Sequence, residues 1–188
     1  YSTWGFWAMS SIDFSPNTGG QNVSVHLAPW VAGQLLSVSD IPTSGTATMS
    51  GSVIMSTAFR HNQSGSIYDV HKYISNGNVQ VQFNWDTGGN YTGTFSLSDY
   101  DETNPIAISA GITDFNFNIS GSGVSYSGNK TNFSNGWGGS VSAQGLLYGG
   151  NSPDESGGRI NVSLSKTGDI NTLGANDFYF AEGIFLVD

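Results

Sequence analysis

The sequence contains no cysteine, so neither disulfide bonds nor thiol chemistry are available to this protein. Charged residues make up 10 % of its 188 residues, against about 25 % in an average soluble domain. Only five residues are Lys or Arg while 14 are Asp or Glu, giving a net charge of −9. No basic patch can follow a nucleic-acid backbone or an anionic membrane surface, and no apolar run approaches the ~20 residues of a transmembrane helix. We therefore expect neither a nucleic-acid partner nor a transmembrane segment.

Glycine and aromatic residues are abundant by contrast. The chain has 26 Gly in 188 residues, about twice the usual share of ~7 %, and 13 % of its residues are aromatic. Such a chain has enough apolar surface to form an ordered core, which disfavours disorder. It begins at Tyr1 without Met or a signal peptide, which predicts a processed product or a segment of a longer protein. Together these features predict a secreted or surface β domain.

Alternation of apolar and polar residues dominates the sequence from residue 41 onward. It is clearest at residues 78–85, where Asn and Gln alternate with Val, Phe and Trp. A period of two is typical of half-buried strands, and we count about eight to ten strands and no convincing helix. The residues expected in the core are Val79, Val81, Phe83, Trp85, Phe95, Leu97, Phe115, Phe117, Val141, Leu147, Ile160, Val162, Phe178 and Phe180.

Consecutive strands separated by short turns predict an all-β fold with antiparallel pairing. One apolar face per strand requires either closure into a barrel or a second sheet. The many glycines favour a barrel of about eight strands, because closing a small barrel needs bends and bulges; a two-sheet sandwich is the alternative. Residues 41–188 are expected to form this barrel. Residues 1–40 are expected to add an irregular extension to the same domain, with one or two strands and a long connection.

Two stretches resemble a known family. Residues 145–158 (GLLYGGNSPDESGG) are similar to the signature of the C-terminal barrel in the transferrin-binding protein B-like family, in which a strand ends in Gly-x-Phe-Tyr-Gly-Pro. Residues 42–51 (PTSGTATMSG) are similar to that family's Pro-x-Ser-Gly-x-Ala-x-Tyr-x-Gly strand. The WGFW of residues 4–7 resembles the Trp-Gly-x-Trp that precedes this strand in related bacterial surface proteins. The EGIF of residues 182–185 is similar to the family's final Gly-x-Phe strand.

The sequence departs from the family pattern at several points. Gly150 stands in place of a Pro, Met49 in place of an aromatic residue, and the acidic turn is one residue longer. The resemblance implies an eight-stranded, lipocalin-like barrel from an exported Gram-negative protein associated with the outer membrane. In that family the barrel is often the structural half of a receptor or haemophore, so the resemblance does not supply a ligand.

The residues of the 145–158 segment have a structural interpretation of their own. Gly149 and Gly150 suit a strand exit, Pro153 suits a turn, and Gly157 is expected in a left-handed conformation. Gly158 would let the next strand begin close to a neighbour. We therefore expect this segment to be a scaffold element and not a ligand site.

The only imidazoles are those of His26, His61 and His71. None has the spacing of a zinc site. His61 and His71 flank a loop rich in Asn, Ser and Gly, so they are the candidates to approach a haem iron. The alternative is that both are exposed histidines at strand ends.

One acidic cluster follows the strand that ends at Leu97. Oxygen ligands at alternating positions suit Ca²⁺, so the cluster is the candidate calcium site, although Asn104 and Pro105 replace the glycine that a twelve-residue calcium loop requires. A solvated acidic loop without a cofactor is the alternative. The candidate ligands are Asp99, Asp101, Glu102 and Asn104.

Catalytic patterns are scarce. Asp86 and Asp114 are paired carboxylates that could serve hydrolysis across a barrel, but nothing in the sequence sets their separation. No Gly-x-Ser-x-Gly elbow occurs, and we expect no enzyme. Trp137 lies within Asn-Gly-Trp-Gly-Gly, with little to pack against locally, and is the expected exposed contact for a partner.

These observations favour a non-enzymatic β-barrel module of an exported bacterial protein that binds a ligand or a protein at the cell surface. A structural subunit of an extracellular multimer or filament is the first alternative, because the composition also suits self-association. A haem or metal-uptake protein is the second. A protein partner or self-association is favoured over a small molecule.

Overall fold

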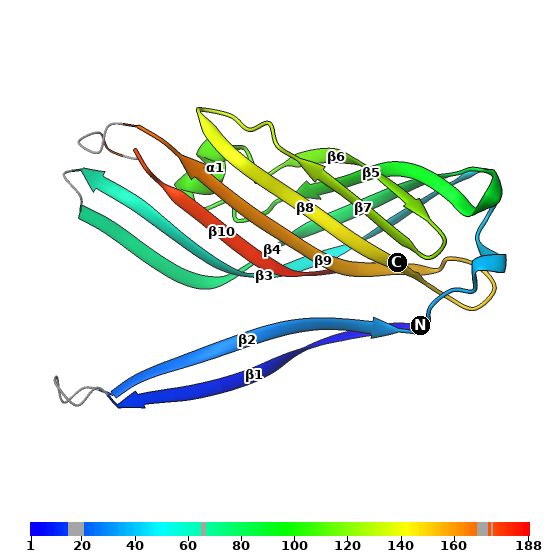
Figure 1. Cartoon of the computed structure of the whole chain (residues 1–188), viewed down its shortest axis with the longest axis horizontal. Coiled ribbons are helices and arrows are strands. Elements are labelled where there is room, and N and C mark those ends of the chain that lie inside the picture. The colour runs from blue at the N-terminus through cyan, green and yellow to red at the C-terminus, as the bar shows by residue number, and fades with distance from the viewer. Residues whose placement is uncertain (15–20, 65–66, 169–172, 174) are drawn as a thin grey trace.

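The computed structural model describes residues 1–14, 21–64, 67–168, 173 and 175–188. Eight antiparallel strands form a closed barrel in the order β10-β3-β4-β5-β6-β7-β8-β9, which confirms the expected barrel over a sandwich (Figure 1). Each strand pairs with its neighbour in sequence, and β10 closes the barrel against β3. The barrel strands are β3 (Thr46–Ser64), β4 (Ile67–Trp85), β5 (Asn90–Ser98), β6 (Phe115–Ser122), β7 (Ser125–Lys130), β8 (Trp137–Tyr148), β9 (Glu155–Lys166) and β10 (Phe178–Val187).

The first strands do not join the barrel. β1 (Ser2–Phe14) and β2 (Gln21–Gly33) form a separate two-stranded antiparallel sheet. We call this sheet the arm. It runs along the outside of the barrel beside β9 and β10 (Figure 1). The expected irregular extension is therefore wrong in one respect, since the extension is a regular hairpin over most of its length.

Three short helices lie in the connections that the structure describes, and the expectation of no helix is wrong for one of them, α1. The Asn104 side chain caps α1 by accepting a 2.9 Å hydrogen bond from the Ile106 backbone N–H. Pro105 occupies the first turn, and Gly111 ends the helix in the left-handed conformation with φ 68°. These are ordinary helix-boundary signals, but the acidic residues before them suggested a loop. The helices are η1 (Val38–Asp40), η2 (Thr87–Gly89) and α1 (Pro105–Ala110).

The barrel interior contains the side chains that the alternation predicts. Val81 and Phe83 on β4 are fully buried, while Gln80 and Gln82 between them are exposed. Aromatic rings contact one another across the interior; Phe83, for example, stacks on Trp85 with ring centroids 5.1 Å apart. Every predicted core residue except Phe178 and Phe180 is buried.

The register of β10 differs from the prediction by one residue. Phe178 is 37 % exposed and Phe180 is partly exposed, whereas Tyr179 and Ala181 are fully buried. Residues 178–181 are apolar on both faces of the strand, so the pattern does not specify its register. The Tyr179 hydroxyl decides it inside the barrel, where it donates a 2.7 Å hydrogen bond to an Asp101 carboxylate oxygen and lies 2.9 Å from the Tyr100 hydroxyl.

Candidate functional site

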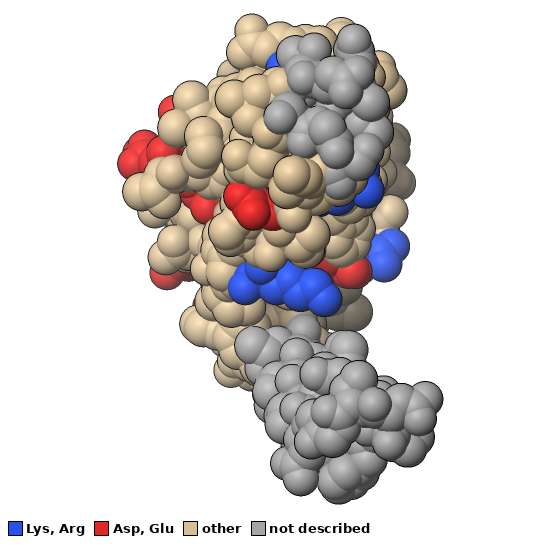
Figure 2. All heavy atoms as spheres, turned by 90° about the vertical axis from the view of Figure 1, so that its left-hand side faces the viewer, with Lys and Arg blue, Asp and Glu red and all other residues tan. Residues whose placement is uncertain are grey.

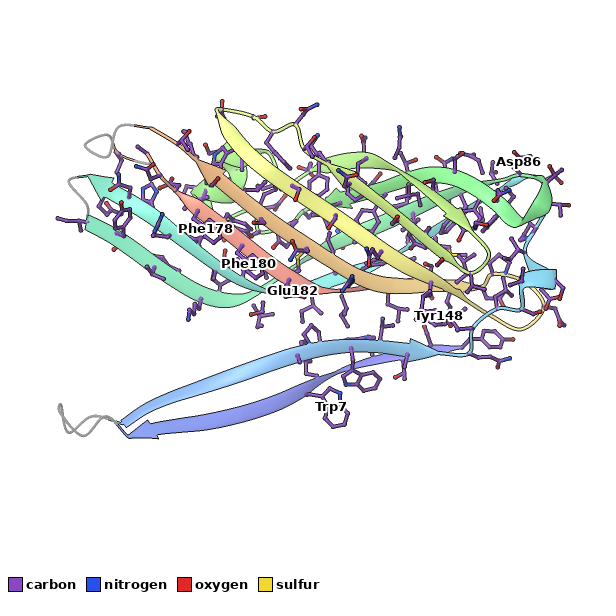
Figure 3. The ribbon with its side chains drawn as sticks, viewed as in Figure 1. Trp7, Asp86, Tyr148, Phe178, Phe180 and Glu182 are labelled. Atoms are coloured by element: carbon purple, nitrogen blue, oxygen red, sulfur yellow. The ribbon has the colours of Figure 1, made fainter. Side chains whose placement is uncertain are left out.

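The arm exposes large aromatic side chains. Trp4, Phe6 and Trp7 are 49 %, 36 % and 72 % exposed. Trp4 and Phe6 lie on the face of β1 that is turned toward the barrel, with ring centroids 5.8 Å apart. Trp7 lies on the opposite face beside Trp30, with centroids 6.5 Å apart, and points away from the barrel (Figure 3). Both faces of the arm therefore present apolar surface that the barrel does not cover.

Glu155, the first residue of β9, holds the arm to the barrel. Its carboxylate accepts hydrogen bonds from the Tyr1 amino group at 2.7 Å, from the Ser2 backbone N–H at 2.6 Å and from the Ser2 hydroxyl. These bonds, that of the Tyr1 amino group first, lower the pKa of Glu155 below its ordinary value. The backbone adds a second link, since the Gly149 N–H donates to the Gln34 carbonyl at 3.1 Å. Sequence reasoning missed this role, although Glu155 lies within the family-like segment.

Two grooves flank the base of the arm. One of about 740 Å³ lies between β2, at Trp30 and Val31, and the outer surface of strands β6 to β9. Gly157 and Gly158 contribute to its lining, and so does the Arg159 guanidinium, whose Nε and Nη2 donate to the Gln144 side-chain oxygen at 2.9 and 2.6 Å. The other groove, of about 390 Å³, lies between β1 and strands β3 and β10.

Backbone packing accounts for the glycine at position 158 of the family-like segment, residues 145–158. An added Cβ at Gly158 would lie 2.0 Å from the Gln144 carbonyl oxygen, so the expected close approach is present. Gly157 lies within β9 and is not among the residues with positive φ, so the expected left-handed conformation there is wrong. The segment also lines the larger groove and anchors the arm, two features that its interpretation as a plain scaffold did not foresee.

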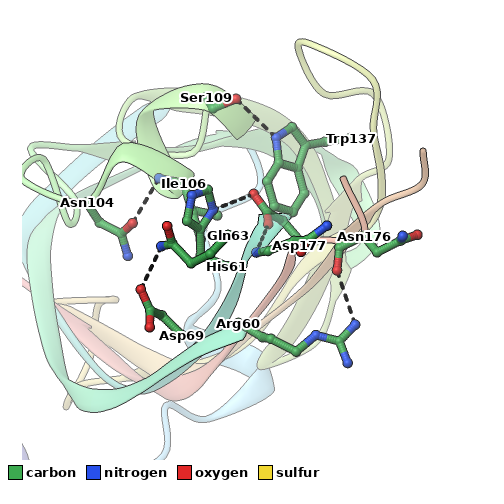
Figure 4. A network of polar contacts seen from close by, with 11 residues as sticks. Arg60, His61, Gln63, Asp69, Asn104, Ile106, Ser109, Trp137, Asn176 and Asp177 are labelled. Carbon is green, nitrogen blue, oxygen red and sulfur yellow. Dashed lines mark hydrogen bonds and ion pairs between the residues drawn. The ribbon is translucent and has the colours of Figure 1, made fainter. Parts of the chain in front are cut away.

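His61 and His71, the haem candidates, lie on the same face of the β3–β4 pair. The register pairs Phe59 with His71, and their rings stack with centroids 4.5 Å apart. His61 Nδ1 lies 3.0 Å from a carboxylate oxygen of Asp177, which is 5 % exposed (Figure 4). Both imidazoles thus have partners within the chain. The side chain of His26 lies outside the described residues.

The candidate calcium ligands do not converge. The Asp101 carboxylate is turned toward Tyr73, Tyr179 and Asn104, each of which donates a hydrogen bond to it. Burial, reinforced by Asp101, raises the pKa of Tyr73 and of Tyr179, so both hydroxyls stay protonated and act as donors. Asp99 instead accepts from the Asn78 side-chain amide at 2.6 Å. Glu102 is exposed to solvent. In the described part of the chain, no three His, Asp or Glu side chains are arranged to hold a metal ion.

Trp137, the expected exposed contact, is only 6 % exposed, which corrects that expectation. Asn135 and Gly136 have positive φ values of 55° and 78° and turn the chain back toward the barrel. The indole then packs into the core, and its Nε1 donates to the hydroxyl of Ser109 in α1 at 3.3 Å (Figure 4). The residues around Trp137 in the sequence do not indicate this burial, because the packing partner, α1, is a separate segment of the chain.

Asp86 and Asp114 do not form a catalytic pair. Asp86 follows β4 and accepts from the Thr87 N–H at 2.7 Å, while Asp114 precedes β6 and accepts from the Asp99 N–H at 3.2 Å. They flank opposite ends of the β5–β6 ladder, and strands rise about 3.3 Å per residue. Two carboxylates so placed cannot act on one bond.

No family model matches the chain, and no curated protein matches it. None of the helices in the described ranges is long and apolar enough to cross a membrane.

Proposed function

We propose that this chain is a non-enzymatic binding module of an exported bacterial protein, and that the arm binds a protein partner at the cell surface. The observation that carries the proposal is the exposure of Trp4 and Trp7, 49 % and 72 %, on a sheet of only two strands. Aromatic residues are enriched at protein interfaces. Exposed aromatic clusters on a monomer mark interaction sites.

The barrel serves as the rigid support in this proposal. Its strands are hydrogen-bonded on both sides, so the described edges open to strand addition belong to the arm. The interior is occupied by packed aromatic rings such as Phe95, which contacts Phe117 and Phe185 with centroids 5.2 and 5.1 Å away. The separation of Asp86 from Asp114 supports a module without catalysis. The family-like segment at residues 145–158 supports an exported Gram-negative origin.

A photo-crosslinking amino acid at position 7 tests the proposal in the cells that produce the protein. We expect the label to join the chain to one defined protein species, and the product to disappear when Trp4→Ser is added. Ile108 on α1 is 56 % exposed and serves as the matched control, because it is an exposed apolar residue outside the arm. Equal labelling from positions 7 and 108, or no product from position 7, would overturn the proposal.

A structural subunit of a multimer is the second candidate, and the free edges of the arm favour it. Strands that pair with one another across molecules can build extended assemblies. The mass of the protein across a range of concentrations separates the two functions, since a monomer at every concentration removes the structural role.

A further inference from the structure

We propose that the arm binds a second copy of this chain, with the free edge of β1 in one copy paired to the free edge of β1 in the other. The two arms then form one four-stranded antiparallel sheet with a two-fold axis between the β1 strands. This inference rests on the proposed function, because it names the protein that the arm binds.

The two edges of the arm are not equivalent. β2 contains Pro29, which has no backbone N–H to donate, whereas the sequence of β1 from Ser2 to Phe14 contains no proline. Prolines in sheets are confined to edges that remain unpaired or to irregular positions. β2 is therefore suited to face solvent, and β1, beyond the Ser2 N–H that donates to Glu155, is the edge left open to a ladder of hydrogen bonds.

The charge distribution favours a second copy over a charged partner. Asp13 is the only Asp, Glu, Lys or Arg among residues 1–39, while the whole chain carries −9. Two copies repel each other wherever their acidic surfaces meet, and least where the arms meet. A partner selected by its own charge would find only the Asp13 carboxylate on the arm to pair with. Figure 2 shows Lys and Arg side chains low on this face of the barrel and others higher up, with acidic side chains between and beside them.

Identical antiparallel edges also match each other chemically. A two-fold axis places each N–H of one β1 edge opposite a carbonyl of the other, so the interface is self-complementary. A hairpin of two strands alone is only marginally stable in water, whereas a sheet of four strands with an apolar face can be stable.

The pairing also gives Trp4, Phe6 and Trp7 neighbours from the second arm. Ile74 on the outer face of β4, 43 % exposed, and Phe178 on β10, 37 % exposed, are further exposed apolar side chains on the barrel.

Disulfide trapping tests both the partner and the edge, because the natural chain has no cysteine. Thr3→Cys and Trp7→Cys place a thiol on β1, and Ala32→Cys and Ala28→Cys place it on the β2 residues directly paired with them. The four variants thus sample the same face of the arm and differ in the strand. After mild oxidation with copper phenanthroline, at a concentration well above the raised dissociation constant of the Trp7 variant, we expect covalent dimers from the β1 variant nearer the two-fold axis at least about tenfold faster than from the β2 variant paired with it.

Sedimentation of the unmodified protein supplies the second readout. We expect a concentration-dependent doubling of mass, with the dissociation constant raised about tenfold or more by Trp7→Ser and unchanged by Ile108→Ser. A monomer at all concentrations would overturn the second copy as partner, while crosslinking from position 7 to another protein would still uphold the proposed function. Faster trapping through Ala32→Cys and Ala28→Cys would overturn the choice of edge.

Discussion

Gly158 on β9 lies directly opposite Gly145 on β8. A Cβ at this position would lie 2.0 Å from the Gln144 carbonyl oxygen and 2.6 Å from the Gly145 Cα. The obstacle is backbone, which cannot rotate aside as a side chain does. The conformation of Gly158 itself is not left-handed, so steric contact and not backbone strain is the reason for glycine here.

Replacing Gly158 by valine is expected to lower the free energy of unfolding by about 1–3 kcal/mol, the usual cost of forcing atoms into a packed site. Gly138→Val is the matched control on β8, because an added Cβ there meets its nearest heavy atom at 3.9 Å. That control is expected to stay within about 0.5 kcal/mol of the natural protein. Urea denaturation followed by tryptophan fluorescence measures both, and equal stability of the two variants would contradict the steric explanation.

The arm is attached to the barrel at its base, through Glu155. Glu155 receives three hydrogen bonds from Tyr1 and Ser2, and the Glu155 side chain is 22 % exposed. Because the attached state lowers the pKa of Glu155, the carboxylate contributes to attachment above its ordinary pKa near 4.5. That contribution is lost as the pH falls through the lowered value. Acid therefore weakens the attachment of the arm.

Glu155→Gln is expected to speed hydrogen exchange of residues 2–7 about two- to fivefold at neutral pH, the effect of losing one charge-assisted contact near the surface. The natural protein should show the same acceleration only on acidification below about pH 4.5, after correction for the intrinsic exchange rate. The variant should show no such step. Identical exchange in both proteins at every pH would contradict the anchoring role of Glu155.

The sequence predicts strands better than it predicts their partners. Val81 and Phe83 alternate with polar residues, so their burial and the barrel class could be predicted from local pattern. The register around Tyr179 could not, because both faces of that segment are apolar and a distant hydroxyl network decides it. Burial of Trp137 depends on α1, which is distant in sequence. The aromatic content of the arm was visible, but its separation from the barrel is a property of long-range pairing.

In the whole molecule, most of the net charge lies outside the arm, which forms the proposed interface. Each copy carries −9, almost all of it outside residues 1–39. Added salt screens repulsion between the barrels, and the screening length falls to about 3 Å at 1 M. The arm itself offers no charge pairs for salt to weaken.

Raising the salt concentration from 0.05 M to 1 M is therefore expected to strengthen self-association severalfold, as measured by sedimentation equilibrium. An interface built on opposite charges would weaken under the same change. Weaker association at high salt would contradict an uncharged contact between the arms.

The pairing of β10 with β3 joins the last strand of the barrel to the first. Ser50 and Asp188 exchange backbone hydrogen bonds at 2.9 and 3.1 Å across this seam, although 138 positions separate them (188 − 50). A chain that emerges from its N-terminus cannot complete the barrel until its final strand is present. Such long-range closure folds slowly. The barrel therefore stays open until β10 has been synthesised and can pair with β3.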